Sequence, residues 1–111
     1  MKKVVLKEFG GPEVLKLEDH PDPVCPEEGW VVETRAIGLN FAEIVERRGR
    51  YRKDQATPYE MGKEASGVVL EKGPSAQGFE VGDSVIVVKF NNGCYGEKVA
   101  AEPGQLLAPP D

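Results

Sequence analysis

Glycine and proline interrupt this chain at short intervals, which restricts it to short strands and turns. The 111 residues include 13 glycines and 9 prolines. These residues end helices and central strands, because proline lacks a backbone N–H and glycine favours turn conformations. Between the interruptions, apolar residues mostly alternate with polar ones, as in strands with one buried face. The pattern predicts one mainly β domain over residues 1–111, with one or two short helices and a partly open β-barrel.

The first third of the chain is predicted to hold a hairpin and a half-buried strand. Residues 2–9 and 13–19 flank a Gly-Gly-Pro turn signal, so we expect them to pair as an opening hairpin. A proline-rich surface connection follows. In residues 30–38, Trp30 and Val32 alternate with polar side chains, which predicts a strand with one buried face.

The remaining strands are predicted to follow a polar loop at residues 49–62. In the strand 64–73, the interior Gly67 predicts a bulge or the close approach of another backbone, because glycine weakens a regular strand. Residues 82–90 form the most apolar strand. The Asn-Gly pair at 92–93 then predicts a two-residue hairpin turn, since both residue types tolerate positive φ.

A helix is predicted to begin after Asn40. Asn40 is expected to cap it through the side-chain oxygen, and Glu43 stands where a capping box places its carboxylate. The predicted buried stripe consists of Phe41, Ile44 and Val45. Capping would use the carboxamide oxygen of Asn40 and leave its NH2 free. A structural role and a ligand-binding role for Asn40 therefore both remain open.

Charge, hydropathy and cysteine usage exclude several classes of function. A formal net charge of -5, with lysines and arginines dispersed among acids, argues against a nucleic-acid partner. No apolar run approaches the length of a membrane span. Cys25 and Cys94 lie far apart and outside any CxxC pattern, which favours two free thiols in a reducing cytoplasm. The expected location is therefore cytoplasmic.

Five segments resemble a known family in their order along the chain: "FGGPEVLKLED", "GLNFAEIVERRGRY", "GKEASGVV", "FEVGDSVIVV" and "GCYGEKVAAEPGQLLAPPD". They resemble the N-terminal, GroES-like substrate domain of the medium-chain dehydrogenase/reductase superfamily. The resemblance is greatest to its zinc-independent quinone oxidoreductase branch, which includes zeta-crystallin and vesicle amine transport protein. It covers the whole chain and implies a GroES-like, partly open β-barrel. Glu43 stands where the branch commonly has aspartate, so the carboxylate is kept.

The resemblance implies a site without a metal. In the zinc-dependent members of the family, a cysteine occupies the position of Asn40 and a histidine occupies that of Lys63. Asparagine is a poor zinc ligand, and an ammonium group repels a divalent cation. The lobe that carries four cysteines in those enzymes is represented here by Cys94 alone. The sole histidine, His20, falls in the proline-rich connection and is expected to be solvated.

The resemblance also implies an activity and three site residues. The intact protein is expected to transfer hydride from NADPH to a quinone or an α,β-unsaturated carbonyl. Asn40 is the candidate hydrogen-bond donor to the substrate or the nicotinamide. Tyr51 is the second catalytic candidate, by stacking or through its hydroxyl, although packing against the barrel is an equal alternative. Lys63 is a candidate cofactor-binding charge, but a solvated lysine paired with Glu64 is the interpretation we favour.

The chain contains no GxGxxG turn of the kind that binds a dinucleotide. The family places that turn later, in a Rossmann domain. We therefore expect a substrate-side domain that is inactive alone and whose partner is a C-terminal Rossmann domain. The intact protein is expected to be a homodimer, and this chain a monomer or weak dimer. The alternative is a stand-alone GroES-like binding or interaction module without catalysis. Its docking loop would need an apolar anchor, whereas the loop at 49–60 is charged.

Overall fold

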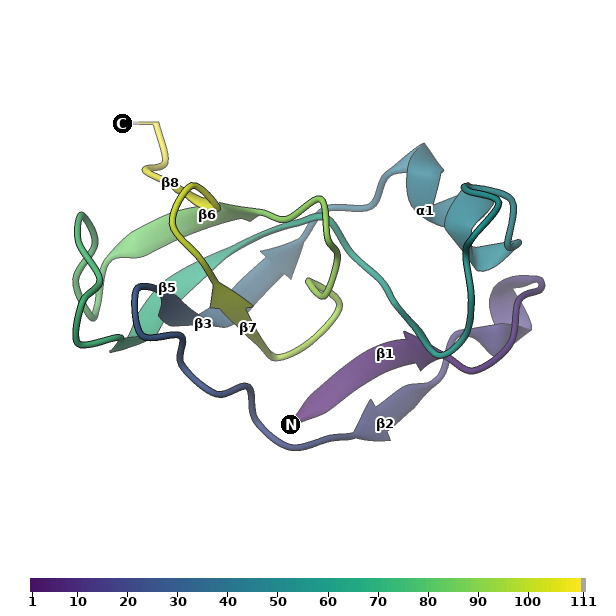
Figure 1. Cartoon of the computed structure of the whole chain (residues 1–111), viewed down its shortest axis with the longest axis horizontal. Helices are drawn as coiled ribbons and strands as arrows, with labels where there is room; N and C mark the ends of the chain where they lie inside the picture. Colours follow the sequence, from purple (N-terminus) through teal and green to yellow (C-terminus); the bar gives the residue numbers. More distant parts are fainter. Residues whose placement is uncertain (111) are drawn as a thin grey trace.

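The computed structural model describes residues 1–110, which are mainly β with one α-helix and one short 3-10 helix (Figure 1). The prediction of a mainly β fold with one or two short helices is confirmed. The α-helix is α1 (Phe41–Arg47) and the 3-10 helix is η1 (Pro12–Val14). Within the described residues, no helix combines the length and the apolar character needed to cross a membrane.

The strands form two antiparallel sheets. The smaller sheet has the order β2-β1-β4 and the larger sheet has the order β7-β3-β5-β6-β8. The smaller sheet contains β1 (Lys2–Leu6), β2 (Leu17–Asp19) and β4 (Tyr59–Glu60). The larger sheet contains β3 (Trp30–Ile37), β5 (Glu64–Lys72), β6 (Ser84–Val88), β7 (Lys98–Ala101) and β8 (Leu106–Leu107). Over residues 1–110 the two sheets do not close into one barrel, so the architecture is open between them.

The predicted opening hairpin is present in the smaller sheet. β1 pairs antiparallel with β2, with Lys2 opposite Asp19. The turn signal between them leads into η1, where Pro12 occupies the first turn and its fixed φ suits a helix start. β1 also pairs with β4, with Leu6 opposite Tyr59. Part of the segment predicted as a loop, residues 49–62, is therefore a strand that joins the region after α1 to the first strand.

The apolar core consists of two clusters. In the larger one, the indole Nε1 of Trp30 donates to the carbonyl oxygen of Phe79 at 3.1 Å, and the two rings pack edge to face with centroids 5.6 Å apart. Val31 is buried as well as Trp30 and Val32, so β3 begins buried on both faces instead of one. The smaller cluster contains Leu6, Val14, Tyr59 and Met61, with Phe9 and Tyr95 packed against it.

The interior glycine of β5 lies where the sheet leaves no room for a side chain. Gly67 pairs with Thr34 of β3, next to a register shift between Thr34 and Ala36. A Cβ atom built on Gly67 would lie 1.9 Å from the backbone oxygen of Glu33. Both alternatives predicted for this glycine, an irregularity and a close backbone approach, are therefore present at one position.

The predicted hairpin after β6 is wrong, although its turn exists. Asn92 and Gly93 have positive φ values of 67° and 112°, and Asn92 N donates to Lys89 O at 3.1 Å. The chain then leaves β6: Cys94 N donates to Gly62 O at 3.1 Å, and β7 pairs with β3. The Asn92 side chain is buried in a polar cluster beside α1, so the turn packs against the helix and the chain continues to β7 beside β3.

Candidate functional site

The inward face of α1 carries two carboxylates. Glu43 and Glu46 are 3% and 0% exposed, whereas Phe41 is 76% exposed and Ile44 is 37% exposed. The predicted buried stripe of Phe41, Ile44 and Val45 was therefore wrong for Phe41 and Ile44, whereas Val45 is half-buried. The groups that meet this face of α1 come from β4, from the start of β5 and from the turn after β6, and they are polar. Together they supply the hydrogen bonds that a buried carboxylate requires.

Asn40 is the N-cap residue of α1, and it forms the predicted capping box with Glu43. The Glu43 carboxylate accepts a hydrogen bond from Asn40 N at 2.8 Å, which is the Glu43 half of a capping box. The N–H of Glu43 also donates to the backbone carbonyl of Asn40 at 3.1 Å. The NH2 of the Asn40 carboxamide is not used by this capping box and is thus available to another molecule.

The Glu43 carboxylate joins three elements. Besides Asn40 N, its Oε2 accepts a hydrogen bond from the Tyr95 hydroxyl at 2.6 Å. Its Oε1 accepts a longer one from Lys63 N at 3.3 Å, at the entry to β5. Because Glu43 is almost fully buried, these donors are its compensation for lost hydration. They also fix the backbone of Asn40 relative to the backbone of Lys63.

The Glu46 carboxylate forms a second, deeper cluster. Its Oε2 accepts hydrogen bonds from Asn92 Nδ2 at 3.0 Å and from the Tyr59 hydroxyl. Its Oε1 has no aligned hydrogen bond but lies 3.0 Å from the Lys63 ammonium nitrogen. The Lys63 ammonium also donates to Asn92 Oδ1 at 2.8 Å. A lysine, a glutamate, an asparagine and a tyrosine from four segments thus form one buried network.

The favoured interpretation of Lys63, a solvated lysine paired with Glu64, is contradicted. The Lys63 side chain is only 13% exposed and its ion-pair partner is Glu46, whereas Glu64 is exposed. The physical reason is that β5 begins directly beside α1, so that the long side chain of Lys63 reaches the only fully buried carboxylate found in residues 1–110. The exposed carboxylate of Glu64 points to solvent and cannot neutralise the buried charge of Lys63, whereas Glu46 can.

Tyr51 lies in contact with the same network. The Lys63 ammonium is 5.0 Å from the centroid of the Tyr51 ring, within the range of a cation–π interaction. Tyr51 N donates to Gln55 Oε1 at 3.0 Å, and Gln55 Nε2 in turn donates to the backbone oxygen of Glu46. Tyr51 as a whole is 43% exposed. All three sequence-predicted site residues therefore lie around α1: Tyr51 touches Lys63, and Asn40 is joined to Lys63 through Glu43.

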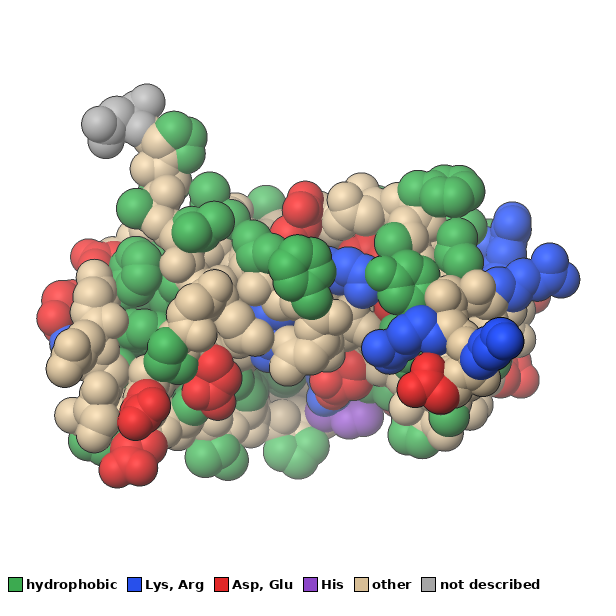
Figure 2. Space-filling model, turned by 45° about the horizontal axis from the view of Figure 1, so that its top comes forward, with side chains coloured by type: hydrophobic (Ala, Val, Ile, Leu, Met, Phe, Trp, Pro, Cys, Tyr) green, Lys and Arg blue, Asp and Glu red, His purple; other side chains and the backbone are tan. Residues whose placement is uncertain are grey.

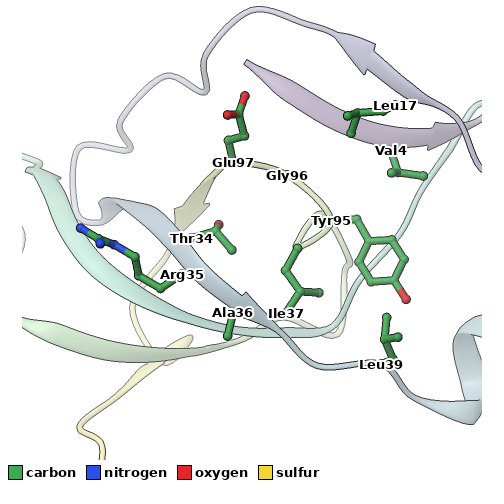
Figure 3. A pocket seen from close by; sticks show the side chains of 10 residues that line it. All are labelled: Val4, Leu17, Thr34, Arg35, Ala36, Ile37, Leu39, Tyr95, Gly96 and Glu97. Atoms are coloured by element: carbon green, nitrogen blue, oxygen red, sulfur yellow. The ribbon is translucent and has the colours of Figure 1, made fainter.

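Two open grooves adjoin this region. One, of about 370 Å³, is lined by apolar side chains with Asn40 and Glu43 among them. The other, of about 450 Å³, lies between β1 and β3 and meets the first at Leu39 and Tyr95. Figure 3 shows Ile37, Leu39 and Tyr95 together at the end of this second groove that is nearer α1. Figure 2 shows lysine and arginine side chains gathered at the α1 end of the molecule, among hydrophobic ones.

Both tyrosines of the network are held in the protonated state. Burial, followed by the hydrogen bond to Glu46, raises the pKa of Tyr59 to about 12. Burial, followed by the hydrogen bond to Glu43, also raises the pKa of Tyr95. A carboxylate that accepts from a phenol stabilises the neutral phenol, because the phenolate would repel it. At neutral pH each tyrosine therefore serves as a hydrogen-bond donor to its glutamate.

The free energy of unfolding is expected to fall as the pH rises from about 10 to about 12. A tyrosine in the unfolded chain loses its proton near pH 10, whereas folded Tyr59 keeps it to about 12. In this interval the native state binds more protons than the unfolded state, so stability that is complete below about pH 10 is lost above it. Urea denaturation at about pH 9 and about pH 11 measures the fall. Tyr59→Phe should reduce it, and an unchanged fall in that variant would contradict the assignment.

The remaining sequence-predicted chemistry lies outside this region. Both cysteines are free, with Cys94 buried and Cys25 partly exposed. His20 is not simply solvated, because its Nε2 lies 3.1 Å from Glu18 Oε1 and the ring is partly buried. Among the residues that the structure describes, no group of three histidine, cysteine, aspartate or glutamate side chains is arranged to hold a metal ion.

Sequence reasoning missed four members of the two clusters. One signal was present for Glu46, which follows Glu43 by three residues and so shares its helical face. For Tyr59, Asn92 and Tyr95 there was no such signal, since each approaches α1 from a segment distant in sequence.

The chain is similar in sequence and in fold to known proteins. Residues 26–107 match the alcohol dehydrogenase GroES-like domain family. Over 102 residues the sequence is 35% identical to human quinone oxidoreductase, covering 91% of this chain and 31% of that protein. The fold matches the crystal structure of human synaptic vesicle membrane protein VAT-1 homolog-like protein with a TM-score of 0.92 and 32% identity, covering 100% of this chain and 36% of that one.

A second structure resembles this chain and contains a nucleotide. Escherichia coli quinone oxidoreductase complexed with NADPH matches with a TM-score of 0.89 and 29% identity, covering 99% of this chain and 33% of that one. The chain spans about a third of the length of the curated relatives it matches.

Proposed function

Because the chain belongs to the alcohol dehydrogenase GroES-like domain family, we propose that it is the substrate-side domain of an NADPH-dependent oxidoreductase. The proposed substrates are quinones and α,β-unsaturated carbonyl compounds. Similarity to quinone oxidoreductases, one of them complexed with NADPH, supports this class of activity. In the proposal, residues 1–111 form the substrate domain, and a Rossmann domain of the intact protein binds the cofactor. The chain alone is then inactive.

One observation carries the proposal: Asn40, Lys63 and Tyr51 converge around two buried carboxylates. The capping box leaves the NH2 of Asn40 free, and Asn40 lines a groove with mostly apolar walls. Ligand sites typically combine such apolar walls with a few well-placed polar groups. In the proposed roles, the Asn40 NH2 donates to the substrate oxygen or the nicotinamide, and the Tyr51 ring stacks on a planar substrate.

We propose that this chemistry needs no zinc. Zinc sites are built from cysteine, histidine and carboxylate ligands, and the two positions considered for it carry a carboxamide and an ammonium. The Lys63 ammonium is already engaged by Glu46 and Asn92. Bound NADPH would supply the hydride. The charge that develops on a reduced quinone oxygen is delocalised over its ring, so hydrogen-bond donors such as the Asn40 amide can stabilise it.

In the intact protein, Asn40→Ala is expected to lower kcat/KM for 1,4-naphthoquinone about 100-fold, as for removal of one preorganised donor. The assay follows NADPH oxidation. Asn91→Ala is the matched control, since Asn91 is exposed and its contact is with Gln105 at 3.3 Å. An unchanged kcat/KM in Asn40→Ala would rule out the role of Asn40. A wild-type protein that binds the quinone without oxidising NADPH would favour the binding module instead.

A further inference from the structure

Glu46 is linked to both Lys63 and Tyr51, directly to the lysine and through Gln55 to the tyrosine. Its carboxylate faces the Lys63 ammonium at 3.0 Å. Its backbone oxygen accepts from Gln55 Nε2, and Gln55 Oε1 accepts from Tyr51 N at 3.0 Å. One residue of α1 therefore fixes the lysine through its side chain and the tyrosine backbone through its main chain.

Three neighbouring groups restrain the Lys63 ammonium. Its neighbours are Glu46 Oε1 at 3.0 Å, Asn92 Oδ1 at 2.8 Å and the Tyr51 ring, with the centroid at 5.0 Å. An ammonium group has three donor hydrogens and no acceptor, so two polar partners and one aromatic face satisfy it. Asn92 is itself held, because its Nδ2 donates to both Glu46 and Tyr59 at 3.0 Å. The position of the charge is therefore set by two buried side chains, Glu46 and Asn92, and by the more exposed Tyr51.

Stability does not account for this arrangement. A buried ion pair gains little over well-packed apolar side chains of similar volume, because both charges lose their hydration. What such a pair does provide is a fixed position for each group. Here the fixed charge lies against the ring of Tyr51, a residue that is 43% exposed, so this is the side of the cluster that a ligand can reach.

We propose that Glu46 is a positioning residue, which holds the Lys63 ammonium against the Tyr51 ring and thereby sets the orientation of that ring for the substrate. The substrate-binding role of Tyr51 in this inference rests on the proposed function. The arrangement of Glu46, Lys63 and Tyr51 does not depend on it. Glu46 itself touches neither substrate nor cofactor in this scheme. Its loss should release Lys63 and let the Tyr51 ring reorient.

The geometry can be tested by NMR on this chain without any ligand. The Tyr51 ring should shift the ε-methylene protons of Lys63 upfield, and Tyr51→Leu identifies that shift by removing it. Glu46→Gln is expected to remove most of the same shift while the methyl signals of Leu6 in the core stay unchanged. Glu60→Gln is the matched control, because Glu60 pairs with Lys3 at the surface. Retention of the Lys63 shift in folded Glu46→Gln overturns the proposal.

A second variant covers the case in which Glu46→Gln does not fold. Gln55→Ala cuts only the main-chain route, in a partly exposed segment between α1 and β4. It is expected to speed hydrogen exchange at Tyr51 N and to reduce the upfield shift of the Lys63 protons. If neither changes, the positioning role is wrong.

Titration with 1,4-naphthoquinone separates this inference from the proposed function. The wild-type chain should show shifts at Tyr51, and Glu46→Gln should bind about tenfold more weakly, since small misplacements of a positioning group lower affinity and rate. In the intact protein, KM should rise more than kcat falls. If the wild type binds no quinone while the ring shift depends on Glu46, the proposed function fails and the positioning stands. Equal affinity of both chains overturns the positioning role.

Discussion

Replacing Glu46 with leucine is expected to lower the free energy of unfolding by about 3–5 kcal/mol, the cost of leaving a buried charge without its partner. In this variant the Lys63 ammonium, 13% exposed, keeps Asn92 as its polar partner but loses the carboxylate. Adding Lys63→Met removes the unpaired charge. Since an apolar pair of similar volume is often as stable as a buried ion pair, the double variant should recover most of the loss.

Urea denaturation of the four chains gives the double-mutant cycle. The surface pair Lys3 and Glu60, with nitrogen and oxygen 2.6 Å apart, is the matched control. Its counterpart substitutions, Glu60→Leu and Lys3→Met, should show a coupling energy below about 1 kcal/mol, as is usual for solvent-exposed pairs. A similarly small coupling between Glu46 and Lys63 would show that the buried network contributes nothing specific to the fold.

Gly67→Ala is expected to destabilise the chain by about 3 kcal/mol or more, as overpacking in a closely packed region does. The added Cβ would lie 1.9 Å from the backbone oxygen of Glu33 and 2.9 Å from Cγ1 of Val32. A side chain could rotate away from such a contact, but a strand backbone cannot. β3 and β5 would have to separate, and they form the centre of the larger sheet.

Ser66→Ala, one residue earlier in β5, is the control, and it should change the free energy of unfolding by less than about 1 kcal/mol. Both variants are measured by urea denaturation with a common slope, so that a difference in midpoint reports stability. A Gly67→Ala chain as stable as the wild type would mean that the two strands are not as close as described. Loss of cooperative unfolding in this variant would instead support the close approach.

Much of the fold was predictable because its signals are local. The opening hairpin depended on a turn signal between two alternating segments, and the pairing of Lys2 with Asp19 confirms it. The start of α1 at Phe41 depended on the residue types next to Asn40. The role of Gly67 depended on the cost of glycine in a strand interior. In each case the residues from which the turn, the helix start or the close approach was predicted are the same residues that form it.

The buried face of α1 was not predictable in the same way. Phe41 with Ile44 and Glu43 with Glu46 are two faces with equal helical spacing, and hydrophobicity favoured the first. The second is buried because Tyr95, Asn92 and Lys63 bring hydrogen-bond donors to it from other segments. The turn at Asn92 does not form a hairpin either: its side chain is buried against Glu46, and the strand that follows pairs with β3.

The amino-acid sequence by itself determined the mainly β architecture, the place where the helix begins and the glycine that the central strands require. Each of these follows from backbone preferences that act within a few residues. Only the tertiary structure decided that the helix turns its carboxylates inward and that Lys63 pairs with Glu46 beside Tyr51. The free energy of a buried charge depends on which donors surround it, and those donors come from segments that only folding brings together.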